Sequence, residues 1–306
     1  MRVDDRLCRH DLTDEEWQRL LPMMPANARR GRRWSDHRMV VNGIMSRTRT
    51  GCPWRDLAGE YGHWKTAYNR HRRWSLDGTW EKILDRLRAG CDEAEGQGWT
   101  LSADSTVVRA HRHAAGARQS CPRSWSRGAP PDDKNLPARA AREALGRPRG
   151  GLSTKIHLAA DRRCRPVSRI LTPGQHGDCP QFIPLLNQVR IARRGKGRPR
   201  TRPARALAGK AYSSAANRAC LRKRGITAVI PVKEDQKKHR RNRGRAGGRP
   251  PAFDPARYAE RNTVERCFGK LKQFRAVAAR YGKRDYMYQA TLDIASIRIW
   301  LRDPVP

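Results

Sequence analysis

The segment 254–274 reads DPARYAERNTVERCFGKLKQF, and its pattern of polar and apolar residues determines how the rest of the chain is interpreted. Asp254 followed by Pro255 is typical of a helix N-terminus, so we predict a helix from there through Phe274. At about 100° per residue, four polar side chains fall within a sector of roughly 60°: Tyr258, Arg261, Glu265 and Lys272. Apolar residues lie beside that stripe. The pattern predicts a helix that packs on a sheet and turns one polar face toward the edge of a cleft.

The residues upstream of this helix, from Trp99 onward, alternate between strands and helices. The order strand, strand, strand, helix, strand, helix, strand indicates an α/β domain. The predicted strands are Thr100–Arg109, Lys155–Ala160, Val167–Leu171, Ala204–Ala208 and Thr227–Pro231, and the predicted helices are Pro180–Arg190 and Ala215–Arg224. The second and third strands form a hairpin around Asp161-Arg162-Arg163.

The first ninety-odd residues predict short helices joined by tight turns. Thr13-Asp14-Glu15-Glu16 has the form of a capping box, and a later helix is expected to begin at Ser35 and to end at Gly51. The helix over 63–75 carries an apolar stripe and, on its surface, the cations Lys65, Arg70, Arg72 and Arg73. Such a module resembles a helix-turn-helix that lays one basic helix in a DNA groove, and the alternative is a helical bundle whose basic face is only solvated.

The composition of the chain favours a polyanionic partner. Its 306 residues include 66 Lys and Arg against 29 Asp and Glu, a formal net charge of +37. DNA, RNA and an anionic membrane surface would all attract that charge. No segment approaches the roughly 20 apolar residues of a spanning helix, and the first residues do not predict a signal peptide, so a cytoplasmic protein is expected. Three Arg/Pro/Gly-rich stretches, 116–151, 193–203 and 233–251, are predicted to be basic loops.

Cysteine spacing indicates neither a zinc site nor a disulfide framework. The eight cysteines lie at least 15 residues apart, so none forms the close pair typical of zinc ligands. We expect reduced thiols that serve mainly as packing residues.

The spacing Tyr258-x2-Arg261-x3-Glu265-x6-Lys272 resembles the Y-R-E-K signature of DDE insertion-sequence transposases, and the surrounding residues resemble the insertion-sequence-five group. Further similar landmarks are TGCPWRDL at 50–57 and RGGLSTKIH at 149–157. The resemblance implies an RNase H-like catalytic domain over 98–306, preceded by a small all-helical DNA-binding domain over 1–97. In that family two strand carboxylates and the helix glutamate hold two Mg²⁺ or Mn²⁺ ions, which suit hard oxygen ligands.

The resemblance assigns roles to individual residues. Asp104 corresponds to the first strand carboxylate and Glu265 to the helix glutamate, so both are predicted catalytic residues and metal ligands. Tyr258, Arg261 and Lys272 are expected to contact DNA phosphates.

The second strand carboxylate is where this sequence departs from the family pattern. The segment ALAGKAY at 206–212 carries Gly209 at the acidic position. Asp161 belongs to a hairpin turn and Asp178 to the start of a helix, so neither is expected to replace it.

Two functions follow from the resemblance, and a third from charge alone. The first is a transposase that binds the inverted-repeat ends of an element, cuts and joins DNA, and works as a homo-oligomer because two ends must be paired. The second is a catalytically defective DNA-binding remnant or repressor, which Gly209 favours. The third is a general RNA-binding protein, for which the sequence holds no single-strand aromatic motif.

Overall fold

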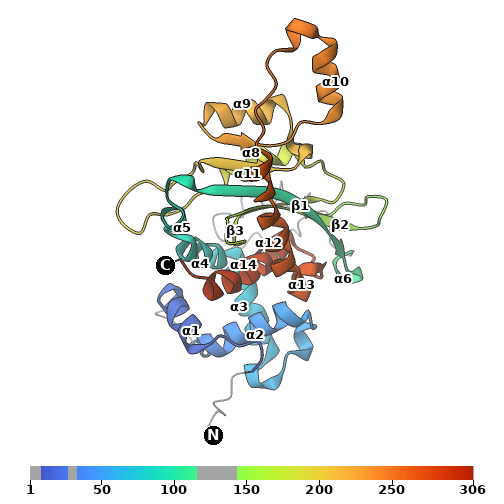
Figure 1. The fold of residues 1–306 in the computed structure, drawn as a ribbon. Coiled ribbons are helices and arrows are strands. Elements are labelled where there is room, and N and C mark those ends of the chain that lie inside the picture. The colour runs from blue at the N-terminus through green and yellow to red at the C-terminus, as the bar shows by residue number, and fades with distance from the viewer. Residues whose placement is uncertain (1–7, 27–32, 116–142, 306) are drawn as a thin grey trace. The chain divides into compact units, whose positions relative to one another are not determined.

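The chain forms two compact units in a computed structural model, which describes residues 8–26, 33–115 and 143–305 (Figure 1). The first unit contains residues 1–87, 108–154 and 270–304, and the second contains 88–107, 155–269 and 305–306. These units do not coincide with a division between residues 97 and 98, because C-terminal segments pack with the N-terminal helices. The division into a DNA-binding and a catalytic domain therefore remains a functional prediction.

The sheet has the strand order β3-β2-β1-β4-β5, and β6 pairs with the far end of β1. Its strands are β1 Thr100–Ala110, β2 Ser153–Ala160, β3 Pro166–Pro173, β4 Arg205–Ala208, β5 Thr227–Val229 and β6 Ala279–Arg280. The strands β1, β4 and β5 run parallel, with Ala103 paired to Ala208. The predicted α/β order is confirmed, and the short strand β4 ends directly before Gly209 and Lys210.

Helices of the second unit cover this sheet and extend beyond it. They are α5 Cys91–Ala94, η4 Gly96–Gly98, η7 Cys179–Gln181, α8 Phe182–Asn187, η8 Lys210–Tyr212, α9 Ala215–Lys223, α10 Glu234–Asn242, η9 Gly244–Gly247, α11 Pro255–Ala259 and α12 Asn262–Lys272, whose last turn joins the first unit. Phe182, Leu185 and Leu221 bury their side chains against the small residues of β1 and β4. This apolar layer fixes the positions of the strand ends.

The basic stretch 233–251 was predicted to be a loop, and that prediction is wrong for much of its length. It contains α10 and η9, and α10 buries none of its residues. A helix without an apolar stripe gives no periodic signal in a sequence, because the periodicity depends on burial of one face. Figure 1 shows α10 projecting beyond α9 within the second unit. Of the other two predicted loops, 193–203 lacks helices, and 116–142 lies outside the described residues.

The helix predicted over 254–274 is divided into α11 and α12. Asp254 caps α11 as expected, since its side chain accepts a hydrogen bond from the Arg257 N–H at 3.1 Å. Between the helices, the N–H groups of Glu260, Arg261, Thr263 and Val264 each bond to the carbonyl three residues earlier. The tighter 3₁₀ pattern interrupts the helix at Glu260 and Arg261, so the predicted polar stripe does not lie on one continuous helix.

The β2–β3 hairpin forms at the predicted turn and contains a buried ion pair. Asp161 and Arg165 are both fully buried, with 2.7 Å between Asp161 Oδ2 and Arg165 Nε. Asp161 also accepts hydrogen bonds from the backbone N–H groups of Arg163 and Arg165. Asp161 thus has a structural role in the turn.

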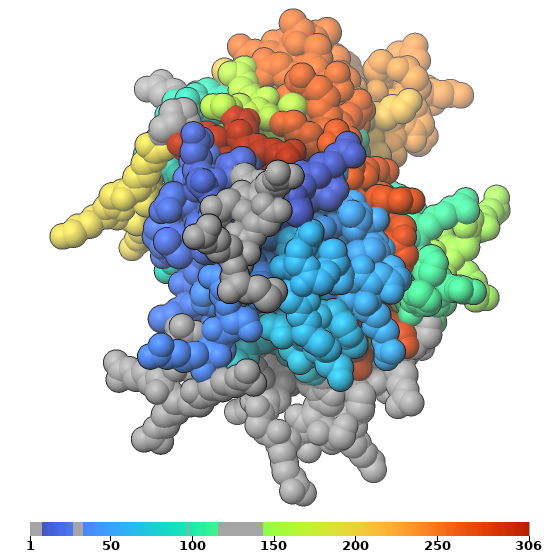
Figure 2. All heavy atoms as spheres, turned by 90° about the horizontal axis from the view of Figure 1, so that it is seen from below, coloured from blue at the N-terminus to red at the C-terminus, as the bar shows by residue number. Residues whose placement is uncertain are grey.

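The first unit contains the N-terminal helices and the C-terminal helix α14, and Figure 2 shows one face of those N-terminal helices in blue to cyan. Its elements are α1 Asp14–Leu20, η1 Leu21–Met23, α2 His37–Thr50, η2 Trp54–Asp56, η3 Gly59–Tyr61, α3 Trp64–Leu76, α4 Thr79–Arg88, α6 Arg112–Ala115, α13 Arg275–Ala278 and α14 Asp285–Arg302, with Arg88 assigned to the second unit. The helix α14 buries most of its residues and packs against α1, α2 and α3. In the described ranges, no helix is long and apolar enough to cross a bilayer.

Of the three helix termini predicted for the first unit, two are confirmed. Thr13 and Glu16 form the predicted capping box, and Gly51 ends α2 with a positive φ of 72°. The exception is the start of α2, where Asp36 rather than Ser35 is the N-cap and accepts from the Met39 N–H at 2.7 Å.

The basic helix α3 buries one of the four cations predicted for its surface. Lys65 and Arg73 are exposed and Arg72 is half-buried, but Arg70 is only 7% exposed. The Arg70 guanidinium lies 4.2 Å from the centroid of the Trp34 ring and contacts His37 Nδ1 at 2.9 Å. The predicted surface position of Arg70 is therefore wrong, because aromatic partners from another segment cover it.

His71 on the same helix makes the stability of the protein sensitive to acid. Burial and the charge of Arg47 lower the pKa of His71 to about 3. An unfolded histidine has a pKa of about 6.5, so the stabilisation is complete above that pH and is lost as the pH falls toward 3. Through this residue, lowering the pH from 7 to 5 is expected to reduce the free energy of unfolding by about 2 kcal/mol.

Urea unfolding of His71→Gln at both pH values measures this contribution. The variant should lose less stability on acidification than the parent. Substitution of the exposed His239 by Gln provides the control and should leave the pH dependence of the parent intact. An equal pH dependence in parent and His71→Gln would contradict the prediction.

Candidate functional site

Asp104 lies in the middle of β1, within the second unit. Its side chain is 22% exposed, and Oδ1 accepts a hydrogen bond from the Ser105 N–H at 2.9 Å. Burial raises the pKa of Asp104 above its usual value, against the opposing effects of that hydrogen bond and of the Arg261 guanidinium. A cation beside this carboxylate opposes the effect of burial.

Arg261 provides that cation and joins Asp104 to Glu265. One guanidinium nitrogen, Nη2, is bonded to Asp104 Oδ2, and Nη1 lies 2.8 Å from Glu265 Oε1. Arg261 is 19% exposed at its side chain, whereas Glu265 is 53% exposed and reaches it across one helical turn. The two carboxylates that the sequence pointed to therefore lie on either side of one arginine.

Gly209 lies beside Asp104 at the end of β4. Ala103 pairs with Ala208 in the parallel register, so Asp104 and Gly209 are the next residues on the two neighbouring strands. A Cβ atom at position 209 would lie 3.7 Å from both Nε and Nη2 of Arg261, an ordinary van der Waals distance. The backbone of Gly209, with φ −64° and ψ 164°, suits any residue. A side chain at 209 would thus point at the same guanidinium as Asp104 and Glu265.

A further acidic group, Asp178, is linked to β1 through Ser105. Ser105 Oγ donates to Asp178 Oδ1 at 2.7 Å, and Lys155 Nζ lies 2.9 Å from the same oxygen. Burial acts to raise the pKa of Asp178, but the hydrogen bonds from Lys155 and Ser105 leave it below its usual value. Tyr212 is buried nearby, and burial together with the charges of Asp104 and Asp178 raises the pKa of its phenol.

Sequence reasoning did not identify Ser105, Lys155 or Tyr212 as neighbours of the site. Each nevertheless lies inside a segment singled out earlier, namely Thr100–Arg109, 149–157 and 206–212. The signal available was proximity in sequence to Asp104 and to the landmark segments. Their contacts with Asp178 depend on strand pairing, which sequence spacing does not give.

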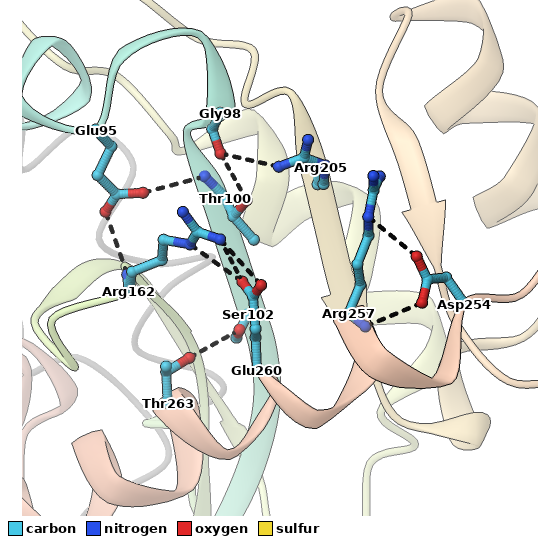
Figure 3. Close-up of polar contacts among 10 residues, drawn as sticks. All are labelled: Glu95, Gly98, Thr100, Ser102, Arg162, Arg205, Asp254, Arg257, Glu260 and Thr263. Carbon is cyan, nitrogen blue, oxygen red and sulfur yellow. Dashed lines mark hydrogen bonds and ion pairs between the residues drawn. The ribbon is translucent and has the colours of Figure 1, made fainter.

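The turn between α11 and α12, which presents Arg261, is held from two sides (Figure 3). Arg162 from the β2–β3 turn forms a bidentate ion pair with Glu260, with Nη2 to Oε2 at 2.8 Å. Thr263 Oγ1 donates to Ser102 Oγ on β1 at 2.9 Å. These contacts fix the turn against the strand that carries Asp104.

The other residues predicted to contact DNA are divided between the two units. Tyr258 lies on α11, with its ring centroid 6.0 Å from Arg261 Cζ, so it borders the site. Lys272 is the exposed last residue of α12 and belongs to the first unit, as do Lys65, Arg70, Arg72 and Arg73. The structure therefore brings together Asp104, Glu265, Arg261 and Tyr258, and it places the other predicted contacts in the first unit.

The donor set around Arg261 suits a divalent cation only in part. Asp104 and Glu265 offer hard carboxylate oxygens, the ligands that Mg²⁺ and Mn²⁺ prefer. Gly209 offers no side-chain oxygen, and the Arg261 guanidinium lies between the two acids. Within the described ranges, no group of three or more His, Cys, Asp or Glu side chains is arranged to hold a metal. Binding of an ion by Asp104 and Glu265 would require Arg261 to move.

Comparison with family models divides the chain between two matches. Residues 12–84 match the model described as "Putative transposase of IS4/5 family", and residues 95–290, well over half of the chain, match "Transposase DDE domain". The second match includes Asp104, Gly209, Arg261 and Glu265.

Curated relatives and one solved structure give further similarities. A "Putative transposase for insertion sequence element IS6501" of Brucella ovis is 28% identical over 151 residues, which are 49% of this chain and 100% of the relative. A "Putative transposase for insertion sequence element IS402" of Burkholderia cepacia is 30% identical over 141 residues, 46% of this chain and 59% of the relative. The "Crystal structure of a pre-cleavage Mos1 transpososome" aligns with 92% of this chain and 81% of its own at 10% identity and a TM-score of 0.22, a similarity too low to indicate a shared fold.

Proposed function

Because the chain belongs to the family of DDE-domain transposases, we propose that it binds the inverted-repeat ends of an insertion sequence and carries out divalent-ion-dependent strand cleavage and transfer. The catalytic residues of this proposal are Asp104 and Glu265. The second unit would serve as an RNase H-like catalytic domain. Pairing of two element ends would require a homo-oligomer.

The observation that carries this proposal is the arrangement around Arg261. Asp104 and Glu265 reach it from a strand and from a helix, and Gly209 is in register beside Asp104. A divalent ion held by the two carboxylates would activate the attacking oxygen and stabilise the leaving one. Arg261, once released from the acids, would be placed to bind a non-bridging phosphate oxygen.

The missing carboxylate at position 209 limits what this centre can do. With two acids instead of three, the site has less negative charge to offset the dehydration of a divalent ion. The chain is therefore expected to bind element ends well and to cleave them slowly. Complete loss of cleavage would make it a DNA-binding remnant or repressor of the same element.

Three measurements test the proposal. A labelled duplex carrying the inverted repeat should bind more tightly than a shuffled duplex and should resist competition by RNA. Slow nicking should require Mg²⁺ or Mn²⁺ and should disappear in Glu265→Gln. Mn²⁺ titration should show weak binding that the double variant Asp104→Asn/Glu265→Gln abolishes. Equal affinity for the shuffled duplex or for RNA would refute specific end binding, and equal Mn²⁺ binding in the double variant would refute the metal site.

The helix α3 is expected to supply part of the DNA affinity. Lys65 and Arg73 are its exposed cations, so Lys65→Ala/Arg73→Ala should weaken duplex binding without disturbing the fold. Loss of one or two phosphate contacts should reduce the slope of log K against log salt by about one to two. Arg70 is excluded from the variant because it is buried between aromatic rings.

Fluorescence anisotropy across a salt series measures this effect. The matched control is Arg222→Ala/Lys223→Ala, which removes the same charge from the exposed end of α9 in the second unit. An equal loss of affinity in both variants would mean that only the total charge matters and would contradict a contact by α3.

A further inference from the structure

A recess in the first unit, which does not contain Asp104 or Glu265, combines aromatic and cationic side chains. Its volume is about 780 Å³, within the roughly 300–1,000 Å³ range of small-molecule sites. The walls come from α2, the segment 51–54, α3, the segment 111–113 and the segment 281–287. All of these segments belong to the first unit.

The most informative residue in this recess is Arg47. It is only 8% exposed, and burial lowers its pKa, yet no carboxylate in the described ranges forms an ion pair with it. Its Nε is buried without a hydrogen-bond partner. Its guanidinium lies 4.9 Å from the Trp54 ring centroid and 6.0 Å from that of Tyr281. A buried cation of this kind is stabilised when an anion enters the recess.

The other charged groups of the recess have the same sign. Arg112 and Lys283 are exposed at its edge, Arg72 is half-buried, and Arg284 is paired with Glu143 at 2.5 Å. No acidic side chain lines the recess among the described residues. The recess thus presents several cations toward one small volume.

Aromatic rings line the recess in two contacting pairs. Trp54 lies edge-on to Tyr68 at 5.6 Å, and Tyr281 contacts His111 at 4.9 Å. Rings of this kind stack on nucleobases irrespective of sequence. A paired base inside a duplex keeps its faces covered by its neighbours, so a concave aromatic wall can reach only a base that is out of the stack.

We propose that this recess holds an unpaired nucleotide of a DNA strand, with its base against Trp54 and Tyr281 and its phosphate near Arg47, Arg112 and Lys283. The proposal rests on the proposed DNA-binding function for the source of the nucleotide. The recess itself is defined independently of the carboxylate site. The proposal also assigns a role to the landmark segment 50–57, which has no role in the proposed cleavage site.

The test uses the full chain and a duplex with one bulged 2-aminopurine, compared with the same duplex fully paired. The parent should bind the bulged duplex about tenfold more tightly and should quench the probe, as expected for one base–aromatic stack. Trp54→Leu should remove the preference and the quenching, and Trp54→Phe should retain most of both. Trp64→Leu, which alters an aromatic residue that does not line the recess, should behave like the parent.

A second variant keeps the test valid if Trp54→Leu fails to fold. Arg112→Gln/Lys283→Gln changes only exposed residues and should reduce the preference for the bulged duplex by at least about threefold, as expected when phosphate contacts are lost. Unchanged preference in this variant would overturn the phosphate assignment.

The remaining outcomes distinguish a failure of the recess proposal from a failure of the proposed DNA-binding function. Equal binding of bulged and paired duplexes overturns the recess proposal while DNA binding stands. Binding of neither duplex refutes the proposed function, and a titration with free dAMP that changes the tryptophan fluorescence of the parent no more than that of Trp54→Phe then refutes the recess as well. Competition by free dAMP at concentrations similar to the DNA affinity would show that the recess takes nucleotides from solution and would overturn the assignment to a DNA strand.

Discussion

Gly209→Asp is expected to raise Mg²⁺-dependent nicking of a labelled inverted-repeat duplex by on the order of a hundredfold, because misplacement of reacting groups by about 1 Å has a cost of that size. The added carboxylate would join Asp104 and Glu265 around Arg261, since a Cβ at position 209 lies 3.7 Å from the guanidinium. The ordinary φ of −64° means that aspartate introduces no backbone strain. Competition by a third acid for Arg261 should also favour its exchange for a divalent ion.

The controls for this prediction are built from the same site. Glu265→Ala provides the blank, and Gly209→Asn tests whether the charge rather than the size of the new side chain is required. Parent activity well above the blank, unchanged by Gly209→Asp and lost in Asp178→Asn, would show that Asp178 completes the site. Asp178 is the relevant competitor because Ser105 links it to the strand that carries Asp104.

Asp161→Ala is expected to reduce the free energy of unfolding by about 3–5 kcal/mol, the usual cost when one partner of a buried ion pair is removed. Both Asp161 and Arg165 are fully buried, so the substitution removes a carboxylate that pairs with the buried Arg165 guanidinium. It also removes the acceptor of two backbone N–H groups in the β2–β3 turn. Urea unfolding of the parent and the variant measures the difference.

A neighbouring residue gives the matched comparison. Arg162→Ala breaks an ion pair with Glu260 in which both side chains are substantially exposed, so it should change stability by about 1 kcal/mol or less. An Asp161→Ala variant as stable as Arg162→Ala would mean that water reaches Arg165 and that the pair is not truly buried.

Features that depend on a few consecutive residues could be predicted from the sequence. The capping box at Thr13, the N-cap at Asp254 and the end of α2 at Gly51 all formed as expected, because their hydrogen bonds join residues three or four positions apart. The order of strands and helices after Trp99 followed from periodicity in the same way. Interactions between residues close in the sequence were therefore enough to predict the α/β class of the fold.

Features that depend on distant partners were missed. The break at Glu260 involves Arg162, which lies 98 residues earlier in the sequence. Arg70 is buried because Trp34 and His37 cover it, and no pattern within α3 signals that contact.

Selection of Asp104, Glu265 and Gly209 as a group came from the family resemblance, since neither composition nor spacing joins them. The strand register and the bonds of Arg261 place all three around one guanidinium. Their catalytic roles remain predictions. The proposed nucleotide recess could not be predicted from the landmark segment 50–57 alone, because its other walls come from segments as far along the chain as residues 281–287.

The packing of α14 against the first helices sets the order in which the protein can be completed during synthesis. Arg298 donates to the Asp11 carbonyl at 2.8 Å and pairs with Glu16 at 2.9 Å, across 287 and 282 residues of chain. A ribosome makes the N-terminal helices first, but they lack this buried partner until α14 has been translated. Contacts between such distant residues form slowly, because ordering the intervening chain costs entropy before the contacts can stabilise the fold. A nascent chain without α14 therefore lacks part of the core of its basic N-terminal helices, so full DNA binding should appear only once α14 has packed against them.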